Sequence, residues 1–332
     1  MIIDAHAHVI PAGFPAREGW PELRPGSVGS AGAADGTRLL VTRTAEVAVA
    51  PPFFDTVARL ASMDQAGLDA ELVSPLPQLL DFDAPAPAFR DQARHINEAV
   101  AAFCAAAPRR VLGLGTVPVQ DVDLAIAELD SIRSLGLRGV EVGATVGGTP
   151  IGDERFVPFF QRVQELDLPV LVHALPTVSY GLAASCVAPF GMPAQSGLGA
   201  ASVIGGPVAR ACPRLRLAFS HGGGGLAMAL PRAHFFWGGS RDRQPPVRDT
   251  DAPSPLDIAR RYYYDALVFD RRALRYLADL VGHTQLVVGS DFPATPREDP
   301  VTGTLSSSGL SQPELDDITW HNAFRFLGPA PA

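Results

Sequence analysis

Short apolar runs alternate with longer amphipathic stretches along most of the chain. The apolar runs predict strands near residues 2–8, 70–74, 111–116, 139–142, 168–173, 215–221, 262–265 and 285–291. Apolar residues at helical spacing predict helices at 54–65, 87–107, 122–135, 154–166, 198–211, 226–237, 271–281 and 312–326. Strands that alternate with helices indicate a parallel sheet, and eight of them indicate closure. We therefore expect an α/β protein, a (β/α)8 TIM barrel, formed by one domain over residues 1–332.

Two segments interrupt this alternation. Residues 11–52, between the first strand and the first helix, are rich in Gly, Pro and Ala but contain two short β-like runs. We expect this insertion to form a small β ribbon over the barrel mouth, and a surface loop without strands is the alternative. Residues 174–197 are also rich in Pro and Gly and are predicted to be an active-site loop, because loops at this face of a barrel tend to carry function.

Composition narrows the class of protein. The chain has 332 residues, of which 47% are hydrophobic and 19% charged, so it is globular. Its net charge of −8 argues against a nucleic-acid partner. No apolar run is long enough to cross a membrane, and the N-terminus lacks the apolar stretch of a signal peptide, so we expect a cytoplasmic protein. All 27 residues counted as Lys or Arg are arginines, which excludes both a Schiff-base lysine and a carbamylated lysine that bridges two metals.

Four of the predicted strands carry residues that commonly bind metal ions. The first strand contains His6 and His8, and because side chains alternate along a strand, these two imidazoles point to the same side. Three later strands end at His173, His221 and Asp291. The carboxyl ends of barrel strands meet at one face, where the active site is built. The pattern therefore predicts a single site at that face.

We expect His6, His8, His173 and Asp291 to hold one divalent metal ion, since a catalytic zinc takes three or four protein ligands and a water molecule. Zinc is the expected metal, and manganese, cobalt and iron also suit these donors. His221 is the remaining residue, predicted to activate the metal-bound water or hydroxide as a general base. Asp291 could also pass a proton on. Taken singly, His173 could be a core histidine, and Asp291 could cap a turn.

Several motifs resemble the amidohydrolase superfamily, and more narrowly the branch that contains aminocarboxymuconate-semialdehyde decarboxylase. They are Asp4-Ala5-His6-Ala7-His8, His173, Ser220-His221-Gly222-Gly223-Gly224, Gly289-Ser290-Asp291-Phe292-Pro293, Met63-Asp64-Gln65-Ala66-Gly67, Met192-Pro193-Ala194, Arg232 and Trp237. The resemblance covers nearly the whole chain. It implies a zinc-dependent, non-oxidative decarboxylase without an organic cofactor, in which the matching His and Asp residues bind the metal and His221 activates the water.

The resemblance also implies a homodimer that binds a small carboxylate. The residue that matches Arg232 reaches the pocket of a neighbouring subunit and grips a substrate carboxylate; a surface charge is the alternative for Arg232. A second substrate arginine of the family would fall near Val47, and Arg38 or Arg43 reaches that register only with a gap. The candidate substrate-binding residues are therefore Arg232, Trp237 and Arg43.

Three functions remain open, and a carbon–carbon lyase is the first choice. It would be a metal-dependent decarboxylase (carboxy-lyase) of a small unsaturated or aromatic carboxylic acid. The second is a metal-dependent hydrolase of an amide, lactone or ring carbonyl, or a hydratase, on the same site. Two convergent arginines at the mouth would favour a dicarboxylate decarboxylase, and an apolar mouth would favour a neutral hydrolase substrate. The third possibility is a non-catalytic barrel. It ranks last because the complete set of five site residues argues against it.

Overall fold

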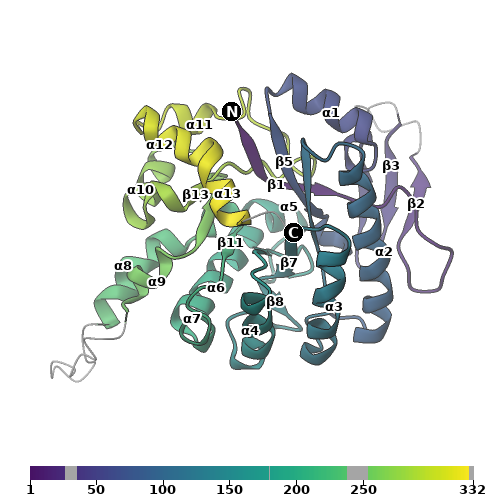
Figure 1. Cartoon of the computed structure of the whole chain (residues 1–332), viewed down its shortest axis with the longest axis horizontal. Helices are drawn as coiled ribbons and strands as arrows, with labels where there is room; N and C mark the ends of the chain where they lie inside the picture. Colours follow the sequence, from purple (N-terminus) through teal and green to yellow (C-terminus); the bar gives the residue numbers. More distant parts are fainter. Residues whose placement is uncertain (27–35, 179, 238–252, 329–332) are drawn as a thin grey trace.

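The computed structural model describes residues 1–26, 36–178, 180–237 and 253–328. Its largest sheet contains eight strands in the order β1 (Ile3–Val9), β5 (Ala70–Pro75), β6 (Val111–Gly115), β7 (Gly139–Gly143), β10 (Val170–His173), β11 (Leu217–Phe219), β12 (Tyr263–Asp265) and β13 (Leu286–Val287). Neighbouring strands of this sheet pair in parallel (Figure 1). Parallel bridges of Asp4 with Val288 and of Ala7 with Phe292 join the first strand to the segment that follows the last. The predicted eight-stranded barrel is confirmed.

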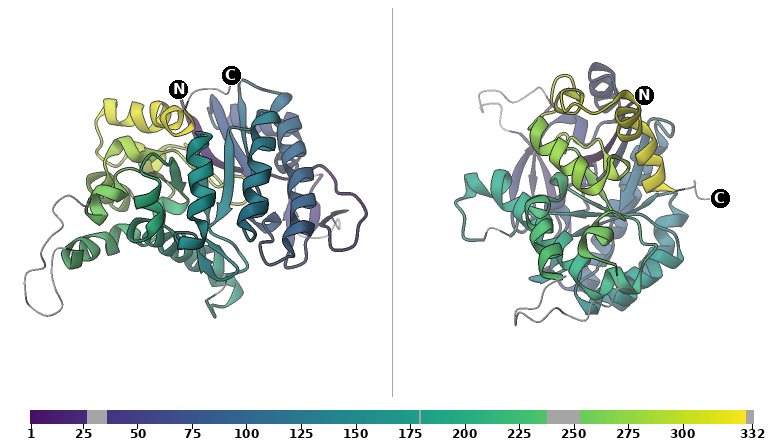
Figure 2. Two further views of the ribbon diagram at one scale, coloured as in Figure 1. Left: turned by 60° about the horizontal axis from the view of Figure 1, so that its bottom comes forward. Right: turned by 90° about the vertical axis from the view of Figure 1, so that its left-hand side faces the viewer.

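Helices surround the strands, as Figure 2 shows. The principal ones are α1 (Thr56–Gln65), α2 (Ala86–Ala105), α3 (Val122–Ser134), α4 (Val157–Glu165), α6 (Met192–Gly205), α7 (Pro207–Ala211), α8 (Leu226–Trp237) and α10 (Arg271–Val281). Aspartates begin three of them: Asp55, Asp121 and Asp270 accept hydrogen bonds from backbone N–H groups in the first turn. Most of these helices bury an apolar face against the barrel, as the spacing of apolar residues predicts, whereas α8 buries only Leu226 and Leu230.

Several boundaries differ from the prediction. The helix expected at 198–211 begins at Met192 and is broken at Gly206, because Pro207 cannot continue the hydrogen-bonding pattern of α6. The predicted loop 174–197 therefore contains helical turns, α5 (Ala184–Cys186) and the π-turn η4 (Val187–Gly191). The helix expected at 312–326 is divided into α12 (Gln312–Asp316), η7 (Asp317–His321) and α13 (Asn322–Leu327).

Shorter elements complete the fold. The insertion contains an antiparallel sheet of β2 (Glu22–Pro25), β3 (Arg38–Val41) and β4 (Glu46–Val49), one strand more than expected. It lies beside α2 in Figure 1, where His95 contacts the Gly13 carbonyl. The other short elements are β8 (Thr145–Val146), β9 (Thr149–Pro150), α9 (Pro255–Ala259), α11 (Gly303–Ser306), η1 (Pro51–Phe53), η2 (Pro77–Leu79), η3 (Glu154–Phe156), η5 (His221–Gly223) and η6 (His283–Gln285).

One end of the barrel is filled by the C-terminal helix. Inward-facing residues from the amino-terminal halves of the strands form an apolar cluster that includes Ile3, Leu72 and Leu171. Phe326 and Leu327 of α13 pack into the same cluster. The carboxyl ends of the strands are thus left as the face on which a site can be built. Among the described helices, none is both long and apolar enough to cross a membrane.

Candidate metal centre

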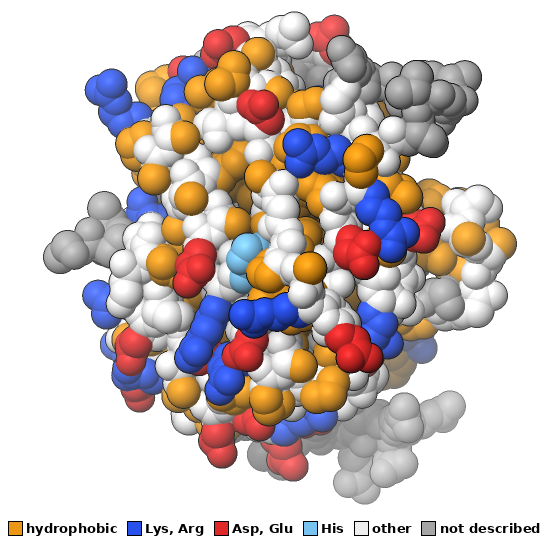
Figure 3. All heavy atoms as spheres, turned by 90° about the vertical axis from the view of Figure 1, so that its right-hand side faces the viewer, with side chains coloured by type: hydrophobic (Ala, Val, Ile, Leu, Met, Phe, Trp, Pro, Cys, Tyr) orange, Lys and Arg blue, Asp and Glu red, His pale blue; other side chains and the backbone are white. Residues whose placement is uncertain are grey.

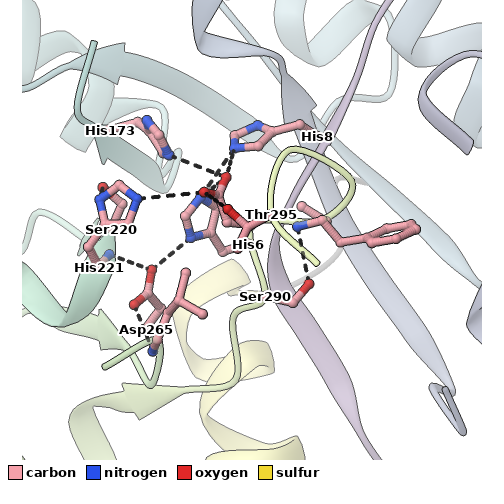
Figure 4. Close-up of polar contacts among 12 residues, drawn as sticks. His6, His8, His173, Ser220, His221, Asp265, Ser290 and Thr295 are labelled. Carbon is pink, nitrogen blue, oxygen red and sulfur yellow. Dashed lines mark hydrogen bonds and ion pairs between the residues drawn. The ribbon is translucent and has the colours of Figure 1, made fainter. Parts of the chain in front are cut away.

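Four side chains converge where β1, β10 and the segment after β13 end. Figure 4 shows His6 and His8, which come from β1, and His173, which holds the last position of β10. Asp291 follows β13 in the chain. One ligand atom from each lies within 4.8 Å of the others, and all four residues are buried. The structure therefore brings together the four residues predicted to bind the metal.

Hydrogen bonds fix how the three imidazoles are oriented. Each Nδ1 atom lies near an oxygen acceptor, and these contacts are His6 with Asp265 Oδ2 (2.7 Å), His8 with the Pro75 carbonyl (3.2 Å) and His173 with the Ala174 carbonyl (2.6 Å). A carboxylate or carbonyl can only accept, so each Nδ1 atom carries the hydrogen. In its neutral form, each ring then presents the lone pair of its Nε2 atom toward the centre of the cluster.

When the rings are neutral, the lone pairs of their Nε2 atoms and the Asp291 carboxylate face one another in a buried space. The Nε2 atoms of His6 and His8 are 3.2 Å apart, and Asp291 Oδ1 lies 2.9 Å from Nε2 of His8. The same oxygen is 3.6 Å from His6 and 4.0 Å from His173. Within the described residues, His173 Nε2 has no hydrogen-bond partner. Three imidazole nitrogens and one carboxylate oxygen fit a divalent cation of the zinc or manganese type.

The charges of the cluster follow from its contacts. Burial lowers the pKa of His6, but the hydrogen bond to Asp265 and that residue's charge outweigh this effect and raise the pKa to about 9. Burial keeps the pKa of both His8 and His173 below its ordinary value. Burial would raise the pKa of Asp291, but the contacts with His221 and His8 hold it well below its usual range. Asp291 is therefore an anion at neutral pH.

His221 lies beside the four ligand residues rather than among them. Its Nε2 atom is 3.8 Å from Asp291 Oδ2, on the other carboxylate oxygen from the one that faces His8. Its Nδ1 atom is 3.1 Å from the hydroxyl oxygens of both Ser196 and Ser220. The backbone of His221 has a φ of 57°, which a non-glycine residue rarely adopts. The chain turns sharply there, and Gly222, with a φ of 62°, continues the turn.

Asp265 is a site residue that the sequence analysis did not identify. It ends β12, and its Oδ2 atom accepts from both the His6 ring and the backbone N–H of His221, at 2.7 and 2.8 Å. Its Oδ1 atom accepts from the Gly222 N–H at 2.7 Å. A signal was present, because Asp265 is an acidic residue at the end of a predicted strand, as Asp291 is. In the sequence analysis, Asp265 is only the last residue of the predicted strand 262–265 and has no role in the site.

A pocket of about 600 Å³ opens above the cluster. His221, Asp291 and Thr295 supply its polar groups, and the remaining lining residues are Ala188, Pro189, Met192, Pro193, Gly224, Leu267, Val268, Phe269 and Ala273. Thr295 donates its hydroxyl hydrogen to Asp291 Oδ2 at 2.9 Å. The segment predicted as an active-site loop, 174–197, thus supplies four lining residues. The described residues of the insertion supply none.

The three candidate substrate-binding residues lie outside this pocket. Arg43 makes a two-pronged ion pair with Asp81 at 2.6 and 2.7 Å and is half exposed. The Arg232 guanidinium on α8 lies 4.8 Å from the centre of the Phe236 ring. Trp237, at the end of the same helix, stacks on His234. On the face in Figure 3, arginine side chains are interspersed with acidic ones, so one sign of charge does not dominate that face.

Comparison with known proteins gives relatives of similar length. A 2-amino-3-carboxymuconate-6-semialdehyde decarboxylase of Dictyostelium discoideum is 27% identical, over 99% of this chain and 92% of the relative. A 2-keto-4-carboxy-3-hexenedioate hydratase of Sphingobium is 26% identical, over 74% of this chain and 72% of the relative. Both relatives therefore act on small carboxylated compounds, by their names.

Solved structures share the fold. The structure of an IDCase from Metarhizium anisopliae covers 98% of this chain and 97% of its own, with a TM-score of 0.82 and 21% identity. A dihydroxybenzoic acid decarboxylase from Polaromonas, with bound manganese and the inhibitor 2-nitroresorcinol, matches 83% of this chain and 87% of its own, with a TM-score of 0.71 and 20% identity. The amidohydrolase family model matches residues 3–328. The chain belongs to the amidohydrolase family.

Proposed function

We propose that the protein is a metal-dependent, non-oxidative decarboxylase of a small aromatic or unsaturated carboxylic acid. One observation carries the proposal. Three buried imidazole Nε2 atoms and Asp291 converge at the base of a pocket whose next polar group is His221. The Dictyostelium relative and the Polaromonas structure are both decarboxylases by name, which favours this reaction over the others that such a site could support.

His6, His8, His173 and Asp291 would hold one divalent cation. Zinc suits the three nitrogens, and manganese is equally plausible on chemical grounds, as the Polaromonas structure illustrates. When bound, such a cation supplies Lewis-acid chemistry, because it polarises an oxygen atom of the substrate or of water next to it. The buried Asp265 carboxylate would keep the His6 ring in the orientation that binding needs.

His221 would move the proton. Decarboxylation breaks the bond between the ring carbon and the carboxylate, releases carbon dioxide and leaves an electron pair on that carbon, which must accept a proton. The Nε2 atom of His221 faces Asp291 at the base of the pocket, where it can exchange that proton. Ser196 and Ser220 hold the opposite ring nitrogen and so fix the direction of Nε2. Asp291 Oδ2, held by Thr295, lies 3.8 Å from His221 Nε2 and would pass a proton on to it after each transfer.

The pocket favours a substrate with one carboxylate and an apolar body. Its walls come from apolar residues of 188–193 and 267–273, and among the described residues no arginine lines it. A second carboxylate would lose its hydration there without a cation to pair with, unless a second subunit supplied one. The same apolar mouth supports the second candidate, a hydrolase or hydratase of a neutral compound.

We also propose a cytoplasmic homodimer. Met228 and Phe235 on α8 are 76% and 75% exposed, which is unusual for large apolar side chains that remain in water. A second copy that packs on α8 would cover them and could bring Arg232, with Trp237 nearby, to the neighbouring pocket. Light scattering of wild-type protein and of Phe235→Glu would test this, because only the variant should be monomeric.

The reaction is tested with metal-loaded protein and three acids: 2,6-dihydroxybenzoate, 5-carboxyvanillate and 2-amino-3-carboxymuconate-6-semialdehyde. We expect carbon dioxide release from at least one, in equal amount with a product that lacks one carboxylate. His221→Asn is the control that should bind metal and release none. Turnover of amides or lactones, with no carbon dioxide from any acid, would overturn the decarboxylase proposal in favour of the hydrolase.

A further inference from the structure

Four charged side chains are buried together on the outer side of the barrel, between its strands and the surrounding helices. They are Asp4, Glu71, Arg59 and Arg297, which we call the buried charge cluster; the first three are fully buried and Arg297 is 7% exposed. Glu71 faces away from the barrel interior, since its neighbours Ala70 and Leu72 belong to the inner apolar cluster. The cluster therefore lies between β1, β5 and α1.

The formal charges of the cluster cancel, and each carboxylate faces at least one guanidinium. Among the described residues, Arg59 Nη2 and Arg297 Nε have no hydrogen-bond partner. Arg59 Nε donates to Glu71 Oε2 at 2.5 Å, and Arg297 Nη2 donates to Glu71 Oε1. Arg297 Nε is 4.0 Å from Asp4 Oδ2, and its Nη1 donates to the Ser62 hydroxyl at 2.9 Å. Two guanidinium groups thus share two carboxylates. Such a set costs much to desolvate, and apolar residues of similar volume would often be as stable.

Three members of the cluster, Arg59, Asp4 and Arg297, contact the backbone or a sequence neighbour of a metal-ligand residue. Glu71 pairs with both arginines. On β1, Arg59 Nη1 donates to the His8 carbonyl at 3.0 Å, and Asp4 Oδ1 accepts from the His6 N–H at 3.2 Å. The same Asp4 oxygen accepts from the Ser290 N–H at 3.1 Å. The cluster therefore joins the strand that carries two ligand histidines to the residue just before Asp291.

The residue after Asp291 is held as well. The Arg297 guanidinium lies 3.5 Å from the centre of the Phe292 ring, and that of Arg59 lies 5.1 Å from it. Contact of a guanidinium with an aromatic face is attractive. Asp291 itself has a φ of 58°, a strained conformation that persists only when its surroundings enforce it. Ser290 and Phe292 supply that enforcement from its two sides.

We propose that the buried charge cluster is a positioning device that sets Asp291 at its distance from His6 and His8. Arg59, Glu71 and Arg297 are then positioning residues, which touch neither the metal nor the substrate. The inference rests on the metal site of the proposed function and not on the reaction that the site performs. It explains why charges that stability alone does not require are buried at this place.

Two variants test the proposal by different routes. Arg297→Met removes one cation while it keeps most of the volume, and Phe292→Leu removes the stacked ring without leaving a buried charge unpaired. Arg94→Met is the matched control, because Arg94 makes a two-pronged ion pair with Glu128, between α2 and α3, at 2.6 and 2.8 Å. Circular dichroism would show that each variant is folded at the temperature used.

Binding of Mn²⁺ and of Co²⁺ alone to metal-free protein is the readout. We expect both test variants to bind Mn²⁺ roughly 10–100-fold more weakly than wild type and to change the visible spectrum of bound Co²⁺, whereas the control should match wild type in both. Folded test variants with wild-type affinity and spectrum would overturn the proposal. If the wild type itself bound neither metal, the proposed function would fail, which is a distinguishable result.

Discussion

The Nδ1 atom of His6 lies 2.7 Å from Asp265 Oδ2, in a contact between the first and the seventh strand of the barrel. The same oxygen accepts from the backbone N–H of His221 at 2.8 Å. One carboxylate therefore orients a metal-ligand histidine and the turn that carries the proposed proton carrier. Residues that hold a ligand histidine in this way typically contribute strongly to metal affinity.

Asp265→Asn should weaken metal binding roughly 10–100-fold, because an amide binds the His6 ring less strongly and can present the wrong atom to it. Titration of metal-free protein with Zn²⁺ by calorimetry would measure the loss. Asp270→Asn is a suitable control, since the Asp270 carboxylate is partly exposed and caps α10 by accepting from the backbone N–H groups of Arg272 and Ala273. It should retain wild-type affinity, and equal losses in both variants would contradict the expected role of Asp265.

Metal binding should release a proton. The pKa of His6 is about 9 without metal, so its ring is protonated at pH 7, and a metal can bind Nε2 only after that proton leaves. Apparent affinity should therefore rise about tenfold per pH unit toward pH 9 and then level off. Calorimetry at pH 7 in buffers of different ionisation enthalpy would count the protons. A heat that does not depend on the buffer would argue against this prediction.

His221→Asn should separate metal binding from catalysis. The side chain of His221 is not among the four ligand residues, so metal content should stay at the wild-type level. Loss of a general acid–base group typically lowers kcat by about 10²–10⁴-fold. Metal analysis and steady-state kinetics would be done on the same preparation. His321→Asn, on η7, is the control histidine and should keep full activity, because His321 is exposed and pairs with Asp317. Loss of metal from His221→Asn would assign that residue to the ligand set instead.

Glu141 on β7 gives a prediction about stability. It is fully buried, and in the described structure neither carboxylate oxygen has a hydrogen-bond partner. Burial raises its pKa to about 8, while the Ser74 hydroxyl and the charge of His6 oppose the shift only in part. The folded state thus favours the protonated acid. Stability should fall as the pH rises from the ordinary value of 4.5 toward 8, and it should not recover above that range.

Glu141→Gln removes this dependence, because an amide stays neutral at every pH. Each unit of pKa difference corresponds to about 1.4 kcal/mol, so the variant should exceed wild type by more than about 1 kcal/mol at pH 8 and by much less at pH 5. Urea denaturation of both metal-free proteins at the two pH values would measure the difference. A gap that is the same at pH 5 and pH 8 would show that the carboxylate does not titrate on unfolding.

The sequence was informative where one local rule decides the structure. Strand periodicity and the meeting of strand ends at one face are enough to predict that His6, His8, His173 and Asp291 lie together. The same rule was not applied to Asp265, whose strand ends Tyr-Tyr-Asp and contains little else to suggest a ligand. The sequence pattern does not reveal the first strand of the insertion, β2 (Glu22–Pro25), because this strand is short, charged and largely exposed.

Other features depend on contacts between distant segments, which a pattern along the chain does not reveal. Arg59 and Glu71 look like surface charges in the sequence, yet both are fully buried because Arg297 arrives from more than two hundred residues away. Simple alternation along the first strand would place Asp4 on the same face as His6 and His8. A register shift between Asp4 and Ala7 turns it instead toward Ser290. Bulges of this kind leave no clear trace in hydropathy.

Within the described structure, α13 closes one end of the barrel, so the pocket at the other end is the route to the site. Phe326 and Leu327 occupy the end remote from the strand tips, so a compound that reacts beside His221 must enter and depart past the walls at 188–193 and 267–273. Incoming acid, outgoing product and any gas released would share this one passage. Substrate entry or product release, rather than bond breaking, would then limit kcat. Bulkier residues at Ala188 or Ala273 would lower kcat without changing the rate of the chemical step.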